Sequence, residues 1–272
     1  MVSRRSISLI YILPVVLLAA GTTAFLVTDL DLRIQRAFFY ESTGAWFRDR
    51  EQPWRFFYKH GALPALVLFL LAFCVLLLGL AHQRLAPLRR QASFLVLLFL
   101  GAPLLLSKLA LPPLWGRPAP ADVAEFGGTQ AFEPILAFHA ASSGTAFPAY
   151  HAALGFYFLG LALLLFAGRH RFFGFLVLLL ALGFGTVNGI ATLATGANFA
   201  SDILWAAGLT WLCAAGLFHA LGLSRGLLYQ PTADSFTVPK WAPTAALVLL
   251  ALISLAWPNS ADYQSPLIET RP

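Results

Sequence analysis

The sequence has few charged residues. Of its 272 residues, 11% are Asp, Glu, Lys or Arg and 59% are hydrophobic. Soluble domains carry about 25% charged residues, so most of this protein's surface does not face water. The run at 63–81, LPALVLFLLAFCVLLLGLA, has no charged residue. A soluble globular enzyme and a disordered chain are therefore excluded, and the sequence predicts a polytopic membrane protein.

Cysteine is also scarce, and no segment alternates between polar and apolar residues. Cys74 and Cys213 both lie in apolar stretches, which excludes a secreted disulfide scaffold. In lipid, helices and closed barrels alone satisfy every backbone polar group, and a barrel requires strands that alternate with a period of two. We therefore expect an all-α bundle.

The apolar runs give the number of spans. A helix needs about 20 mainly apolar residues to cross a bilayer. A seventh run at about 241–257 is shorter, but Trp241 and Trp257 bound it, and tryptophan favours the membrane interface. We predict six to seven spans in one integral membrane domain over 1–272. The six long runs are about 6–27, 63–81, 92–111, 146–168, 172–193 and 199–220.

The basic residues predict the orientation. With the N-terminus inside, nine of the 18 Lys and Arg residues lie in cytoplasmic segments, where Asp234 is the single acidic residue. Lys and Arg in short inner loops are the usual orientation signal in a cytoplasmic (inner) membrane. The net charge of +6 therefore needs no nucleic-acid partner. The nine residues are Arg4, Arg5, Arg84, Arg89, Arg90, Arg169, Arg171, Arg225 and Lys240.

Two long outer segments join the predicted spans. Residues 28–62 interleave aromatic and charged side chains, as helices on a membrane interface do, and residues 112–145 are rich in Pro and Gly. The N-terminal apolar run continues through 25–27, which favours an uncleaved anchor over a signal peptide.

Polar residues gather at the outer ends of the third to sixth spans. Lys108 ends the third span, Arg117 lies just beyond it, and His151 falls in the first turn of the fourth. Asn198 and Asp202 begin the sixth span, and their spacing of four predicts a shared helix face. Ionisable groups in a membrane are costly and are therefore functional candidates. We predict a polar pocket that faces outward and whose cations suit an anionic head group.

Structural roles would also explain these residues one by one. Asn198 is a good helix N-cap, and Asp202 then lies near the positive end of the helix dipole. His151 follows a proline at a helix start, and Lys108 has a side chain long enough to reach the interface.

Small residues in the fifth span suggest close helix packing. Gly185 and Gly189 are four residues apart, a spacing that lets two membrane helices approach closely. The same pattern places Asn188 and Thr192 on the packed face. This is a structural prediction and implies no chemistry.

Three stretches carry polar motifs: GRPAPADVAEFGG at 116–128, AFPAYHAALGF at 146–156 and TGANFASDILWA at 195–206. Together with the DLDLRIQRAFF segment and the order of spans, they resemble the type-2 phosphatidic acid phosphatase superfamily, particularly its bacterial membrane branch. The resemblance covers most of 28–220. It implies a phosphatase-like helical core, a lipid or isoprenoid phosphate as ligand, and neither a cofactor nor a metal.

In that family a histidine of the third stretch attacks phosphorus, and an aspartate orients it. A histidine of the second stretch protonates the leaving oxygen. His151 and Asp202 match the general acid and the orienting carboxylate, but the nucleophile position holds Asn198 and an arginine position holds Thr192. An amide nitrogen has no free lone pair with which to attack phosphorus. The resemblance therefore implies a scaffold with impaired chemistry.

The same family holds the phosphate with one lysine and two arginines. Lys108 and Arg117 lie near these positions in the first stretch, at a different spacing. Alignment of that stretch on its Phe-Gly-Gly instead places Pro112 and Ala119 there. We take Lys108 and Arg117 as the candidate substrate-binding residues.

Three functions remain open. The first is a catalytically impaired membrane protein that binds or escorts a phospholipid or isoprenoid-phosphate head group at the outer face. The second is an active phosphohydrolase with altered machinery that uses His151 as its general acid. The third is a transport or assembly subunit, suggested by the aromatic and basic segment at 28–62.

Overall fold

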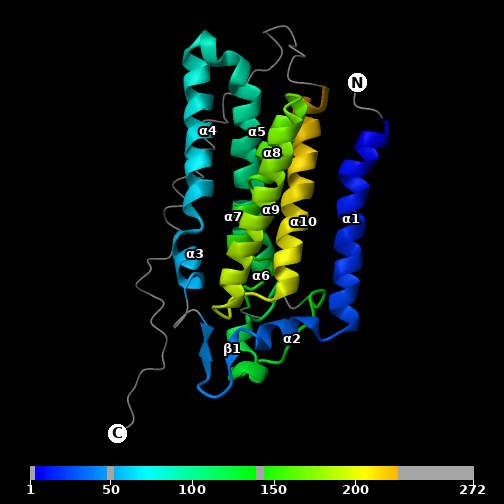
Figure 1. Cartoon of the computed structure of the whole chain (residues 1–272), viewed down its shortest axis with the longest axis vertical. Helices are drawn as coiled ribbons and strands as arrows, with labels where there is room; N and C mark the ends of the chain where they lie inside the picture. Colours follow the sequence, from blue (N-terminus) through cyan, green and yellow to red (C-terminus); the bar gives the residue numbers. More distant parts are fainter. Residues whose placement is uncertain (1–3, 48–51, 139–143, 226–272) are drawn as a thin grey trace. The chain divides into compact units, whose positions relative to one another are not determined.

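The structure is a computed structural model that describes residues 4–47, 52–138 and 144–225. Most of the regular structure in these residues is helical (Figure 1). Two short strands, β1 (Phe39–Tyr40) and β2 (Ala45–Trp46), pair antiparallel, with Phe39 opposite Trp46. The α-helices are α1 (Arg4–Val27), α2 (Leu30–Arg36), α3 (Trp54–His60), α4 (Leu63–Ala81), α5 (Arg89–Phe99), α6 (Leu111–Trp115), α7 (Tyr150–Phe156), α8 (Leu159–Ala167), α9 (Arg171–Leu193) and α10 (Ala200–Ala220). The other helical segments are the 3₁₀ turns η2 (Gln83–Leu88), η4 (Pro120–Asp122), η5 (Ala124–Phe126) and η6 (Leu223–Arg225), and the π-helix η3 (Leu100–Ala110).

The predicted all-α membrane bundle is confirmed. Five helical segments are long and apolar enough to cross a membrane, and α1 with α2 meets the same test as a pair bent by 79°. The predicted seventh span at 241–257 lies outside the described residues. The five segments are Trp54–Ala81, Gln83–Asp122, Tyr150–Ala167, Arg171–Leu193 and Ala200–Ala220.

The centre of the bundle is formed by α7, which packs against α9, η3 and α10. Further helices pack in pairs: α4 against α5, α8 against α9, and α1 against α10. In Figure 1 these long helices run side by side, and α2, β1 and α6 lie at one end of them. That end holds the beginnings of α7 and α10, so it is where the three motif-bearing stretches meet.

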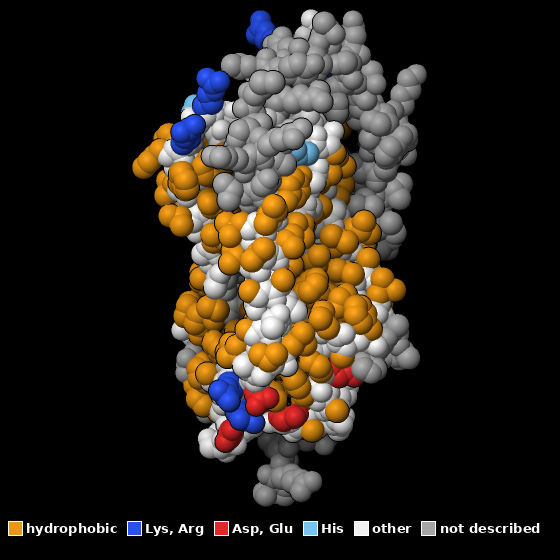
Figure 2. Space-filling model, turned by 90° about the vertical axis from the view of Figure 1, so that its right-hand side faces the viewer, with side chains coloured by type: hydrophobic (Ala, Val, Ile, Leu, Met, Phe, Trp, Pro, Cys, Tyr) orange, Lys and Arg blue, Asp and Glu red, His pale blue; other side chains and the backbone are white. Residues whose placement is uncertain are grey.

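Many apolar side chains lie on the outside of the bundle. Leucines and phenylalanines of α4 and α9 are largely exposed, for example Leu71 at 60% and Leu179 at 67%. Such side chains suit a lipid environment, which does not penalise exposed apolar surface. Figure 2 shows a broad hydrophobic zone between the two ends, with acidic and basic side chains together at the end that carries α2.

Glycines allow the closest helix approach, as the small-residue pattern predicts. A Cβ added to Gly155 on α7 would lie 2.5 Å from the Gly185 Cα of α9. A Cβ on Gly189 would meet the Ile203 side chain of α10 at 2.6 Å. Because no ordinary Cβ contact is that short, α7, α9 and α10 depend on these glycines for their spacing. The packing prediction for 185–189 is confirmed.

Candidate functional site

Backbone hydrogen bonds bring the three motif-bearing stretches together. Arg117 follows α6, whose C-cap Gly116 has the left-handed conformation (φ 67°) that glycine adopts at low cost. The Ala146 N–H donates to the Arg117 carbonyl at 3.1 Å, and the Ala149 N–H donates to the Asp202 carbonyl at 3.3 Å. These contacts join the loop after α6 to the beginnings of α7 and α10.

A buried ionic cluster at this end consists of Asp31, Arg117, Ser201 and Asp202. Arg117 Nη1 donates to Asp202 Oδ1 at 2.6 Å and to Ser201 Oγ at 2.8 Å, and Nη2 donates to Asp31 Oδ2 at 2.8 Å. Nε donates to the Glu133 carbonyl at 3.0 Å. Four of the five guanidinium N–H groups are therefore engaged, and the Arg117 side chain is fully buried.

Asp31 reaches the ionic cluster from α2. Its Oδ1 accepts from the Ser201 N–H at 2.9 Å, and its Oδ2 accepts from the Ser201 hydroxyl at 2.5 Å. One turn further along α2, Gln35 donates to the Leu193 carbonyl at the end of α9, at 2.8 Å. Asp31 and Gln35 form the buried face of α2 and fasten it over the ends of α9 and α10.

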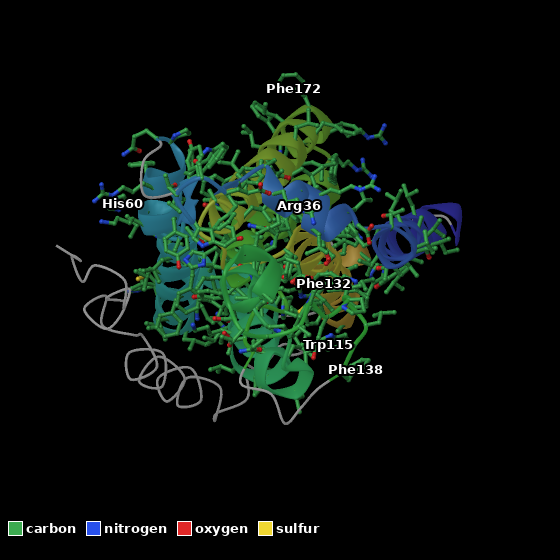
Figure 3. The ribbon with its side chains drawn as sticks, turned by 90° about the horizontal axis from the view of Figure 1, so that it is seen from below. Arg36, His60, Trp115, Phe132, Phe138 and Phe172 are labelled. Carbon is green, nitrogen blue, oxygen red and sulfur yellow. The ribbon has the colours of Figure 1, made fainter. Side chains whose placement is uncertain are left out.

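Aromatic rings seal the ionic cluster. The Arg117 guanidinium carbon lies 4.6 Å from the centroid of the Phe199 ring and 5.9 Å from that of Phe132. Phe132 also packs edge-on against Phe199, with 5.3 Å between centroids. Figure 3, a view from this end, shows Phe132 between the Arg36 end of α2 and the segment that carries Trp115. These rings add cation–π attraction and keep the charges apart from solvent.

The beginning of α10 differs from the prediction. The helix starts at Ala200 with Phe199 as its N-cap, and Asp202 Oδ2 accepts from the Phe199 N–H at 2.7 Å. Asn198 therefore precedes the helix, and its Nδ2 donates to the Ala146 carbonyl. The predictions that Asn198 caps the helix and shares a face with Asp202 are wrong, because Asp202 closes the first turn one residue later than expected.

A second group, here called the cationic–aromatic cluster, consists of Tyr58, Lys108, Tyr150 and His151. The Lys108 ammonium of η3 lies 5.5 Å from the centroid of the Tyr150 ring and acts electrostatically on His151. The His151 ring stacks on Tyr58 of α3, with centroids 4.9 Å apart and planes 19° apart. His151 lies in the first turn of α7, as predicted. Lys108 is exposed, and within the described residues it forms no ion pair.

Thr192 lies at the end of α9, and it is completely buried. Its hydroxyl donates to the Gly189 carbonyl at 2.7 Å within its own helix. The predicted site residues thus fall into four places, since Asn198 precedes α10 and donates to the Ala146 carbonyl. Arg117 and Asp202 lie in the ionic cluster, Lys108 and His151 lie in the cationic–aromatic cluster, and Thr192 contacts its own helix.

Sequence reasoning missed Asp31 and Tyr58. Asp31 and Gln35 are four residues apart, so they share a face of any helix in that segment, and that signal was available. Tyr58 carries no such signal, because stacking on His151 depends on how α3 packs beside α7 and α9. Within the described residues, no three His, Cys, Asp or Glu side chains gather closely enough to hold a metal ion.

Comparison with known protein families identifies one family. The family model of the PAP2 superfamily matches residues 90–225, which is half of the chain. The chain belongs to the PAP2 superfamily. No curated protein and no solved structure matches it. The matched range contains both Arg117 and Asp202, and Asp31 lies outside it. The protein therefore has a lipid-phosphate phosphatase-like scaffold in the membrane.

Proposed function

We propose that this protein is a catalytically impaired member of the superfamily that binds a phospholipid or isoprenoid-phosphate head group at the outer face of the membrane. The observation that carries the proposal is the pairing of Asp202. Its two oxygens accept hydrogen bonds from Arg117 and from the Phe199 N–H. Position 198 holds asparagine, so the histidine that such an aspartate would orient is not there. A carboxylate engaged in this way activates no nucleophile.

Electrostatics support the same conclusion. The ionic cluster holds one cation and two carboxylates, so its formal charge is negative, and Arg117 has no exposed surface. Phosphoryl transfer depends on cationic donors aimed at the phosphate oxygens. A phosphate at this cluster would meet two carboxylates and no available guanidinium, so we assign Arg117 a structural role.

The cationic–aromatic cluster is the better place for a head group. Lys108 is exposed near the end of its span, beside the Tyr150 ring. An ammonium on a long flexible stem binds phosphate as a point charge without a fixed geometry. Tyrosine rings and the charged ends of lysine side chains both favour the level of the lipid head groups.

Phosphate release tests the catalytic half of the proposal. Purified protein is mixed with phosphatidic acid or an isoprenyl pyrophosphate in detergent micelles, and free phosphate is measured. We expect no release above the detergent blank. Release that is lost in His151→Ala would instead establish the altered phosphohydrolase and overturn the proposal.

Lipid retention tests the binding half. Protein purified with mixed phosphatidic acid and phosphatidylcholine is extracted, and the retained lipids are quantified by mass spectrometry. We expect enrichment of phosphatidic acid in the wild type and its loss in Lys108→Ala. Lys59→Ala is the matched control, because Lys59 is an exposed lysine of α3 at the same end of the bundle. Equal enrichment in all three proteins would contradict a head-group site at Lys108.

A further inference from the structure

We propose that the Asp31 carboxylate is a built-in anion that fills a site suited to a small oxyanion. The site, here called the anion cradle, consists of the Arg117 guanidinium, the Ser201 hydroxyl and the Ser201 backbone N–H. The ligand class is a carboxylate or a phosphate, because both present paired anionic oxygens to convergent donors.

Three donors from two separate segments converge on the one carboxylate. Arg117 donates at 2.8 Å, the Ser201 hydroxyl at 2.5 Å and the Ser201 N–H at 2.9 Å. Ser201 lies in the first turn of α10, a helix of 21 residues, where the helix dipole is positive. Arg117 and Ser201 are fully buried. The donors are thus fixed in place independently of α2.

Charge balance shows that the carboxylate of Asp31 is additional. Arg117 already has a carboxylate partner in Asp202, so that pair is neutral without α2. Asp31 adds a second negative charge, with a side chain only 4% exposed. A second carboxylate at this depth is tolerated because the cradle supplies the donors that water would otherwise supply. The cradle therefore accepts an anion in addition to Asp202.

The anion comes from a short helix outside the long bundle helices. Asp31 lies in the first turn of α2, after the 79° bend from α1. Besides the three bonds of Asp31, a side-chain bond from Gln35 to Leu193 holds α2 in place. The α2 helix therefore covers the anion cradle and places the Asp31 carboxylate in it. This inference rests on the proposed function for its consequence, since a cradle filled by the chain itself holds no substrate phosphate.

Anion rescue of an Asp31 variant tests the inference. The apparent melting temperature of full-length Asp31→Ala in detergent is measured with sodium formate, with sodium phosphate and with sodium chloride at equal ionic strength. We expect formate or phosphate to raise it by several degrees above chloride, because an anion that binds the folded state stabilises that state. The wild type, whose cradle is filled, measures the general effect of each salt, because phosphate stabilises folded proteins without binding a site. The rescue is the rise in Asp31→Ala beyond the rise in the wild type.

The control is Asp29→Ala, which removes a carboxylate from the exposed N-cap of α2. It should respond like the wild type. An Asp31→Ala protein that shows no anion effect beyond that of the wild type overturns the inference. If that variant cannot be recovered in chloride, recovery with formate present during extraction supports the inference, and failure to recover it contradicts it. None of these outcomes depends on lipid binding or hydrolysis, so the proposed function fails or holds separately.

Discussion

Arg117 is the residue on which the candidate site depends. It joins α2, the loop that carries Glu133, and the beginning of α10 through four side-chain hydrogen bonds. A buried ion pair contributes little compared with well-packed apolar residues, yet removal of one partner leaves an uncompensated charge. The cation and the carboxylates of the cluster therefore differ in importance. Loss of Asp31 leaves a neutral pair, whereas loss of Arg117 leaves two carboxylates together.

The first prediction follows at the residue scale. Arg117→Gln should reduce the free energy of unfolding by about 3–5 kcal/mol, because Asp31 and Asp202 lose their shared cation inside the protein. Arg36→Gln, at the exposed end of α2, should change it by less than about 0.5 kcal/mol. Unfolding of both proteins in the same detergent gives the comparison. If the two are equally stable, Arg117 has no structural role.

At the scale of elements, the contact of α7 with α9 fixes the position of His151. Gly155 lies one turn after His151 on α7 and packs against the Gly185 backbone of α9. Asn188 of α9 is buried in the same contact, near Gly155 and Gly61. The stack of His151 on Tyr58 thus depends on the distance between α7, α9 and the end of α3.

A glycine substitution tests this contact. Gly155→Ala should destabilise the protein by about 1–3 kcal/mol, because the new methyl group overlaps the α9 backbone, which cannot move aside as a side chain can. Gly183→Ala is the matched control, since nothing lies within 4 Å of a Cβ there and α9 gains a better helix former. The melting temperatures of the two variants should shift in opposite directions. A Gly155→Ala protein as stable as Gly183→Ala would show that the close approach is unimportant.

At the scale of the whole molecule, the few charges are unevenly divided between the two ends of the bundle. Arg84 in η2, Arg169 in the turn before α9 and Arg171 at the start of α9 have no neighbouring acidic residue in those segments. The end that carries α2 holds acidic and basic residues together (Figure 2). This asymmetry is the basis of the predicted orientation, with the N-terminus inside and the site outside, which stays a prediction.

Cysteine labelling measures the orientation. In a background with Cys74 and Cys213 replaced by alanine, Glu41→Cys in the β1–β2 turn should react in intact cells with a maleimide that does not cross the cytoplasmic membrane. Arg84→Cys in η2 lies at the opposite end of α4 and should react only after lysis. The reverse pattern would place the site on the cytoplasmic side and would exclude an outer-face head group.

Much of the fold and part of the site follow from the sequence alone. Apolar runs predicted the spans because a bilayer imposes length and polarity on each helix locally. The small residues at 185–189 predicted close packing for a similar local reason. The PAP2 resemblance identified the stretches that meet at the site. These local rules predicted Asn198 as a possible N-cap of α10, and this was wrong. The N-cap is Phe199, because its N–H donates to the Asp202 side chain.

The partners of the buried charges were decided by the tertiary structure alone. Asp31 is 86 residues from Arg117 and 170 from Ser201 in the sequence, and Arg117 is 85 from Asp202. A sequence shows that a charge lies in an apolar chain and therefore needs a partner. Which partner it finds depends on how α2, the loop after α6 and α10 pack at one end of the bundle. Because of that packing, Arg117 forms ion pairs with two carboxylates, and Lys108 stays exposed.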